Sequence, residues 1–166
     1  MERELLLLGL LRRTDMHGYQ LHEFINQNMV SCIDLKKPTA YFLLEKMADK
    51  GWITQTETHE GNRPPRRVYQ VTAEGERVFQ RLLRENLAEH HPARFTGDIG
   101  LTFLDTLLPS EARDLLLVRR AALREELENV RAIPVHSGSS QLVIEHRARH
   151  LQTELDWLDE LIERLG

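Results

Sequence analysis

The 166-residue chain has a single cysteine, Cys32, and lacks any long hydrophobic run. One cysteine excludes an internal disulfide framework and is typical of a protein that works in a reducing compartment. The thiol is either a small, partly buried side chain, which is the favoured interpretation, or a redox sensor. The longest apolar stretch, residues 5–11, is too short to cross a bilayer, and no signal-peptide cleavage site follows it. We therefore expect a cytoplasmic protein without a membrane partner.

A surplus of basic residues is also absent, because the formal net charge is −4. Residues 1–92 hold 13 Lys or Arg and 13 Asp or Glu, so the whole negative excess lies in residues 93–166. Bulk charge therefore gives no argument for a nucleic-acid partner, and only the position of the basic residues can give one. Residues 36–67 stand out, with seven basic and four acidic side chains.

The patterns that carry catalysis are missing too. The chain has no glycine-rich loop after a strand, no paired cysteines and no plausible pair of carboxylates in a cleft, so we expect neither an enzyme nor a cofactor. His146, His150 and Glu154 recur every four residues, but three ligands on one straight ridge span about two helical turns, too far for one ion. A solvated ridge is favoured there. A regulator that senses metal or redox state through this ridge or Cys32 stays open as an alternative.

Local signals predict three helices, a hairpin and a further helix in residues 1–91. Apolar spacing predicts a buried helix over residues 2–13, and a second helix follows Thr14. Pro38 suits the first turn of a third helix, and Gly51 suits the residue that ends it. Residues 52–58 and 68–71 are rich in β-forming residues and are separated by turn formers, which predicts a two-stranded hairpin. Thr72 then caps a fourth helix.

This order predicts a mainly α fold, a winged helix-turn-helix domain with a two-stranded β-wing. In such a domain the third helix enters the major groove, where its first residues reach the base edges. Arginines on the wing suit a narrow minor groove; we expect Arg63 or Arg66 to reach it and Arg67 to sit at the base of a strand. The predicted DNA-binding residues are Lys36, Lys37, Thr39, Ala40, Tyr41, Arg63, Arg66 and Arg67.

The residues of the third helix have different expected roles. Thr39 and Ala40 are small and let the backbone approach the DNA closely, while the two lysines before them suit phosphates. Tyr41 either donates its hydroxyl to a phosphate, which is favoured, or packs in the core with only its tip in water. Phe42 is either a core residue, which is favoured, or a base contact.

The second half of the chain predicts a helical hairpin that makes a dimer. Residues 92–109 are expected to form a linker, and residues 110–166 two helices, the first capped by Ser110. Apolar residues of both helices alternate spacings of three and four, which indicates a helix-against-helix seam. Two helices alone bury too little apolar area, so we expect them to pack against a partner subunit. The predicted dimerisation residues are Leu123, Leu127, Leu151, Leu155, Trp157, Leu158 and Ile162.

Five blocks in a fixed order give the chain a family resemblance over about residues 5–83. They are residues 6–11, residues 17–21, the run Thr39-Ala40-Tyr41 with Leu44, Met47 and Gly51, the wing at residues 61–67, and the run of Tyr69, Thr72 and Gly75. In these blocks the chain resembles the PadR family of bacterial transcriptional regulators. It departs from the family at Pro38, where members often have Gly, and at Met47, where Leu is usual. The tail, residues 154–158 above all, is similar to the C-terminal dimerisation helices of the longer members.

The resemblance implies a homodimeric repressor that binds double-stranded DNA at an inverted-repeat operator. It also implies release by a small organic effector, since family effectors include phenolic acids and flat hydrophobic drugs. Phe95, Phe103 and Trp157 lie near the expected domain junction and are candidate effector-binding residues, although plain interface core is favoured for them. The rival interpretation is a winged helix that binds protein instead of DNA. A wing with three arginines argues against that rival.

Overall fold

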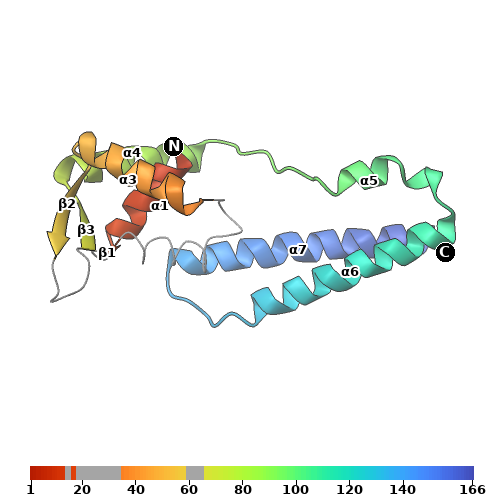
Figure 1. Cartoon of the computed structure of the whole chain (residues 1–166). Helices are drawn as coiled ribbons and strands as arrows, with labels where there is room; N and C mark the ends of the chain where they lie inside the picture. The colour runs from red at the N-terminus through yellow and green to blue at the C-terminus, as the bar shows by residue number, and fades with distance from the viewer. Residues whose placement is uncertain (14–15, 18–34, 59–65) are drawn as a thin grey trace. The chain divides into compact units, whose positions relative to one another are not determined.

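The computed structural model describes residues 1–13, 16–17, 35–58 and 66–166 (Figure 1). The chain divides into two compact units, Met1–Pro92 and Ala93–Gly166. Most of the predicted second helix lies outside the described residues, as do Cys32, in the expected connector after it, and Arg63. The side chain of Arg66 lies outside them as well.

The first unit combines three described helices with a small sheet. The helices are α1 (Glu2–Leu11), α3 (Lys37–Asp49) and α4 (Ala73–Ala88), and the strands are β1 (Met16–His17), β2 (Ile53–Thr58) and β3 (Arg66–Val71). β2 and β3 pair in antiparallel register, which confirms the predicted hairpin. The sheet order is β1-β3-β2, so β3 has a second antiparallel neighbour. The prediction that a helix follows Thr14 directly is wrong at Met16 and His17, which form β1; two residues are too few to show the alternating pattern of a strand.

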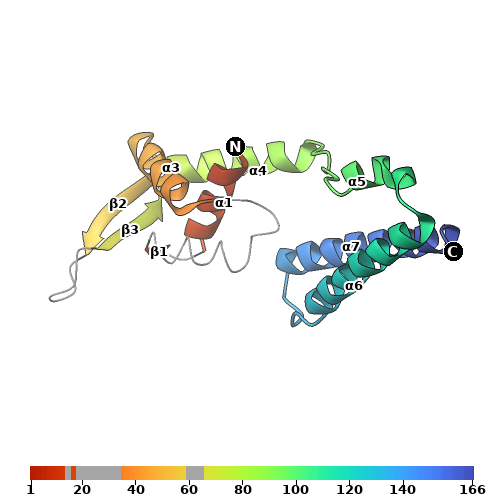
Figure 2. The ribbon, with the colours of Figure 1, turned by 45° about the vertical axis from the view of Figure 1, so that its right-hand side comes forward.

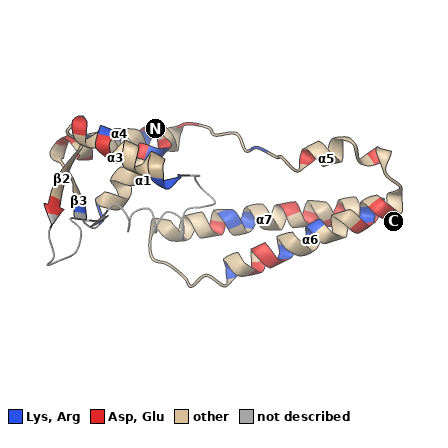
Figure 3. Ribbon diagram, in the orientation of Figure 1, with Lys and Arg blue, Asp and Glu red and all other residues tan. Residues whose placement is uncertain are grey.

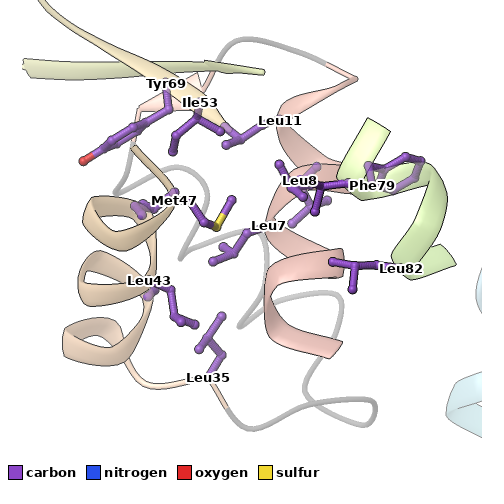
Figure 4. Close-up of a cluster of buried hydrophobic side chains, with 14 residues drawn as sticks. Leu7, Leu8, Leu11, Leu35, Leu43, Met47, Ile53, Tyr69, Phe79 and Leu82 are labelled. Carbon is purple, nitrogen blue, oxygen red and sulfur yellow. The ribbon is translucent and has the colours of Figure 1, made fainter. Parts of the chain in front are cut away.

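One hydrophobic core holds these elements together (Figure 4). Its fully buried side chains come from α1, α3, β2 and β3, and α4 adds Phe79 and Leu82. Burying a side chain of this size contributes about 1.5–3 kcal/mol. The largest fully buried residues of the unit are Leu7, Leu8, Leu44, Met47, Ile53 and Tyr69.

Two caps set the ends of α3 and the start of α4, and both confirm the predictions. Gly51 has φ +70°, its N–H donates to the Ala48 carbonyl at 2.9 Å, and the Trp52 N–H donates to the Met47 carbonyl at 2.9 Å. These two bonds form a Schellman motif, which needs a left-handed residue at the position of Gly51. Thr72 accepts from the Gly75 N–H at 3.0 Å and so caps α4.

The second unit is dominated by an antiparallel helical hairpin. Short α5 (Asp98–Thr102) and the 3-10 turn η1 (Leu104–Thr106) precede α6 (Pro109–Arg131) and α7 (Ser139–Arg164). α6 and α7 lie side by side in two views (Figures 1 and 2). The predicted cap Ser110 is wrong by two positions, since Leu108 is the N-cap and Pro109 starts the helix. None of the described helices is long and apolar enough to cross a membrane.

The predicted seam forms within one chain, which corrects the assignment of its residues to a subunit contact. Leu127, Leu151, Leu155, Leu158 and Ile162 are each at most 7% exposed and pack between α6 and α7, and Leu123 is partly buried with them. A side chain already buried by its own hairpin has little surface left for a partner subunit. Of the predicted dimerisation residues only Trp157, at 39% exposure, remains largely accessible.

Ion pairs at the edges of the seam explain why Arg120 interrupts its apolar pattern. Arg120 pairs with Asp159, and Arg119 pairs with Glu154, so two consecutive arginines of α6 reach two carboxylates of α7. All four side chains are partly exposed, which limits the stabilisation that each pair can contribute. Their main effect is therefore on the register of the two helices.

Candidate DNA interface

α3 begins with a basic turn that is open to solvent. Lys36 is the N-cap residue, Lys37 and Pro38 start the helix, and all three are exposed. The first turn holds no acidic residue, and no side chain caps it. Backbone N–H groups and the helix dipole favour an anion at such an end. The start of α3 is thus suited to a phosphate, as the two lysines predict (Figure 3).

The two faces of α3 differ from the prediction at one position. The inner face is made of Ala40, Leu43, Leu44 and Met47, none more than 8% exposed. Ala40, at 2%, packs its methyl group in the core, so only its small size and its backbone bear on the predicted close approach to DNA. Phe42 is 62% exposed and so is not the core residue that was favoured. At 100° per residue, Ala40 and Phe42 lie on opposite sides of the helix.

The remaining predicted residues of α3 are accessible in part. Thr39 and Tyr41 are half-buried, so each offers part of its side chain to the outer surface. Glu45 and Lys46, one turn beyond Phe42, are exposed. The sequence analysis gave Phe42 only as a less favoured base contact and did not include Glu45 and Lys46, although the helical period places all three on one face.

Arg67 connects the hairpin to α3. Its guanidinium lies 3.5 Å from a carboxylate oxygen of Glu45 and 3.9 Å from one of Glu57, which is its cross-strand neighbour. All three side chains are about half exposed, so these pairs are weak in energy. They nevertheless place two negative charges beside the predicted DNA-binding arginine. Sequence alone could not show this, because Glu45 and Arg67 are brought together by the tertiary fold.

Tyr69 lies behind this contact. Its ring is fully buried, and its oxygen points away from the leucines of the core (Figure 4). Among the described residues the hydroxyl has no hydrogen-bond partner of normal geometry. Burial raises the pKa of Tyr69 above its usual 10.0, while the nearby Arg67 guanidinium opposes this shift. Tyr69 is therefore a neutral core residue that supports the base of the hairpin.

The predicted effector residues do not gather around a described cavity. Phe95 is 56% exposed, Phe103 is 62% exposed, and neither they nor Trp157 line the hollow beside α5 and η1 in the second unit. That hollow measures about 550 Å³. It is lined by Leu101, Thr102, Leu104, Asp105, Leu107, Pro109, Ala112 and Leu165. In the described residues no group of three or more His, Cys, Asp or Glu could hold a metal ion, and His146 and His150 are exposed.

Comparison with known proteins agrees with this geometry. Residues 7–81, which run from the second half of α1 through α3 and the hairpin into α4, match the model of the transcriptional regulator PadR-like family. The chain carries a PadR-like regulator domain. Its charged helix start and its hairpin thus belong to a domain of transcriptional regulators, as the five sequence blocks predicted.

Individual relatives extend the likeness beyond the PadR-like domain. The negative transcriptional regulator PadR of Bacillus subtilis is 27% identical over 129 residues, which are 74% of this chain and 69% of that protein. A crystal structure of Bacillus subtilis PadR in complex with operator DNA superimposes with a TM-score of 0.85 at 20% identity, over 98% of each chain. The complex of the same protein with p-coumaric acid gives 0.79 at 19% identity, over 98% of this chain and 97% of that one. At these identities the two structures establish the fold, including the C-terminal helices.

Proposed function

We propose that this chain is a homodimeric, sequence-specific DNA-binding repressor that a small organic effector releases. The observation that carries the proposal is the exposed outer face of α3, which begins with a basic turn and whose Glu45 pairs with Arg67 of the hairpin. A major groove admits one helix, and phosphates at its rim suit lysines and free N–H groups. The negative transcriptional regulator named above supports the repressor assignment. A regulator that binds chromosomal DNA would act in the cytoplasm.

The proposed contacts fall into two groups. Lys36, Lys37 and the start of α3 contact phosphates, and Thr39 and Tyr41 contact the groove with their accessible parts. Arg63, Arg66 and Arg67 are the proposed DNA contacts of the wing, although Arg67 also forms ion pairs with Glu45 and Glu57. Phosphate contacts set the affinity and its salt dependence, while base contacts set the sequence.

The dimer contact needs a surface that the hairpin does not use. α6 exposes Leu115 at 56% and Val118 at 70%, and Ala122, one turn further, is exposed too. Their spacing of three and four repeats the pattern of a packed helix face on a side away from α7. We propose that a second copy of the chain covers this α6 stripe (Leu115, Val118 and Ala122), with Trp157 of α7 as a further contact. Two paired subunits would read an inverted repeat.

The effector would act in the second unit. The hollow beside α5 and η1 has the size and the mostly apolar lining of a site for a small aromatic molecule. Phe95, Phe103 and Trp157 remain candidates for such a site once a partner subunit is present. A phenolic acid is the first compound to test, because p-coumaric acid is bound by the Bacillus subtilis relative. Release requires only that the effector prefer a conformation in which the two recognition helices are wrongly spaced.

The test is selection of bound duplexes from a random DNA pool, followed by affinity measurements at several salt concentrations. An enriched inverted repeat, bound by two chains with an affinity that falls steeply with salt, is the expected result. Adding p-coumaric acid or a hydrophobic drug should then reduce binding. A pool that shows no enrichment, together with binding to other proteins in place of DNA, would support the winged-helix protein-interaction module. A response to zinc, chelator or oxidant would support a metal or redox sensor.

A further inference from the structure

Among the described residues, Phe42 has no packing role that explains its position. It lies in the middle of α3 and is 62% exposed, and it belongs to neither the buried core nor the residues packed against it. Of the 13 residues of α3, all of which the structure describes, it is the only large apolar side chain that is exposed. Its neighbours along the same face are polar or small, with Thr39 one turn before it and Glu45 and Lys46 one turn after it.

The surroundings of Phe42 leave it free to project outward. Glu45, the neighbour one turn further along α3, is drawn toward the hairpin by Arg67 at 3.5 Å. Arg67 is itself held by Glu57 at 3.9 Å on the adjacent strand. The nearest acidic group on the outer face is therefore paired with a cation, which lowers its repulsion toward DNA. A helix lying in the groove would meet the base edges with Phe42.

Only one group in the major groove suits an aromatic ring that can neither donate nor accept a hydrogen bond. The base edges there offer hydrogen-bond donors and acceptors, except at thymine, which presents its C5-methyl group. A benzyl group cannot bond a phosphate or a polar base edge, but it gains by covering a methyl group. An exposed ring in this place therefore discriminates thymine from the other bases without a hydrogen bond.

We propose that Phe42 is a specificity-determining residue that contacts the C5-methyl group of one thymine in each half-site. This inference rests on the proposed function, because it requires that α3 enter the major groove. It adds a base contact to a helix whose other predicted contacts mostly go to phosphates. The contact can be tested by removing a single methyl group, since deoxyuridine differs from thymidine only in lacking that methyl.

The experiment replaces each thymine of the selected duplex by deoxyuridine, one symmetric pair at a time, and measures the affinity of the full chain. For the wild type, one pair of positions should weaken binding by about fourfold for each half-site, the effect of one methyl group losing its contact. With the Phe42→Ala variant, thymine and deoxyuridine duplexes should bind equally at that position. Its salt dependence should match the wild type, because no phosphate contact is lost.

Two variants control for indirect effects. Leu87→Ala truncates another exposed apolar side chain, at 78% exposure on α4, and should keep the full deoxyuridine effect. Phe42→Leu keeps a smaller apolar contact and should retain part of the effect, which covers the case that Phe42→Ala binds too weakly to measure. Circular dichroism should show unchanged helix content in all variants.

The results that would overturn the proposal are distinct from failure of the proposed function. A wild type that binds its duplex but tolerates deoxyuridine at every position would reject the methyl contact alone. The same holds if Phe42→Ala keeps the wild-type sensitivity. A wild type that binds no duplex would reject the proposed function and, with it, this inference.

Discussion

At the scale of single residues, the start of α3 separates a role in binding from a role in stability. Lys37 is exposed, and among the described contacts its ammonium group has no ion-pair partner. Its removal should therefore cost little in folding. Its charge would act only when DNA is present.

The variant Lys37→Ala should weaken binding to all duplexes, whatever their sequence. The slope of log affinity against log salt concentration should become less steep by about one unit, because one phosphate contact is lost. Arg81→Ala on α4 removes the same charge from an exposed residue that pairs with Glu85, and serves as the control. An equal change of slope in both variants would show that Lys37 acts through net charge and not through a contact.

Tyr69 gives a prediction of pH dependence. Its pKa is raised in the folded chain, so its contribution to stability is complete below the usual 10.0 and is lost as the pH rises through the folded value. The variant Tyr69→Phe should equal or exceed the wild type in free energy of unfolding at pH 7, because it removes a buried hydroxyl without a described partner.

The measurement is urea unfolding of both proteins at pH 7 and pH 11. The wild type should lose more stability between these two values than Tyr69→Phe, and the comparison cancels the lysines that titrate in both. A clear loss of stability in Tyr69→Phe at pH 7 would mean that the hydroxyl has a strong partner after all.

At the scale of elements, the contact of α4 with the hairpin is the tightest described. A Cβ atom at Gly75 would lie 1.9 Å from the carbonyl oxygen of Trp52 and 2.9 Å from its carbonyl carbon. That oxygen also accepts a hydrogen bond from the N–H of Thr72, the N-cap residue of α4, at 3.0 Å. The start of α4 therefore both bonds to this peptide group and packs against it. α4 can approach Trp52, the residue before β2, this closely only because residue 75 has no side chain.

Gly75→Ala should therefore force α4 away from the hairpin and lower the free energy of unfolding by about 3 kcal/mol. Gly100→Ala is a matched control, because a Cβ there meets nothing within 4 Å. It should change stability by at most about 0.5 kcal/mol. Unfolding in urea, followed by circular dichroism, measures both. Equal stability of the two variants would mean that α4 can shift away from Trp52 at little cost in free energy.

Elements were predictable where one local signal decides them. Pro38, Gly51 and Thr72 each have a backbone role that depends on near neighbours, and the structure confirms all three. The favoured core assignment of Phe42 was wrong because one residue of error rotates a helix position by 100°, and only the packing of α3 on α1 and β2 sets that rotation. The pair of Arg67 with Glu45 was unreachable, since it depends on tertiary contacts.

At the scale of the whole molecule, the same difficulty affects the α6–α7 hairpin. Its a/d spacing predicted a packed seam, and the structure confirms the seam. Periodicity shows that one face of a helix is packed, but not which element packs against it. For this reason residues that α6 and α7 bury against each other were predicted to lie at a subunit contact. The apolar residues still exposed for contact with a second subunit lie outside the three-and-four spacing of the α6–α7 seam.

The dimer prediction follows from this division. Leu115→Asp combined with Val118→Asp places two charges on the exposed α6 stripe, and should give a folded monomer, because neither side chain contributes to the seam. Leu155→Asp combined with Leu158→Asp buries two charges at positions of 6% and 0% exposure, and should unfold the hairpin itself.

Sedimentation and circular dichroism together distinguish the two outcomes. The first variant should keep its helix content and sediment with the mass of a monomer, half that of the dimer. It should bind operator DNA more weakly, because a monomer contacts only one half-site. The second should lose helix content as well. If the first variant still sediments as a folded dimer, the subunits meet elsewhere, and Trp157 on α7 is the next position to change. Since an effector would have to alter the spacing of two recognition helices, the location of this contact also decides where such a molecule can act.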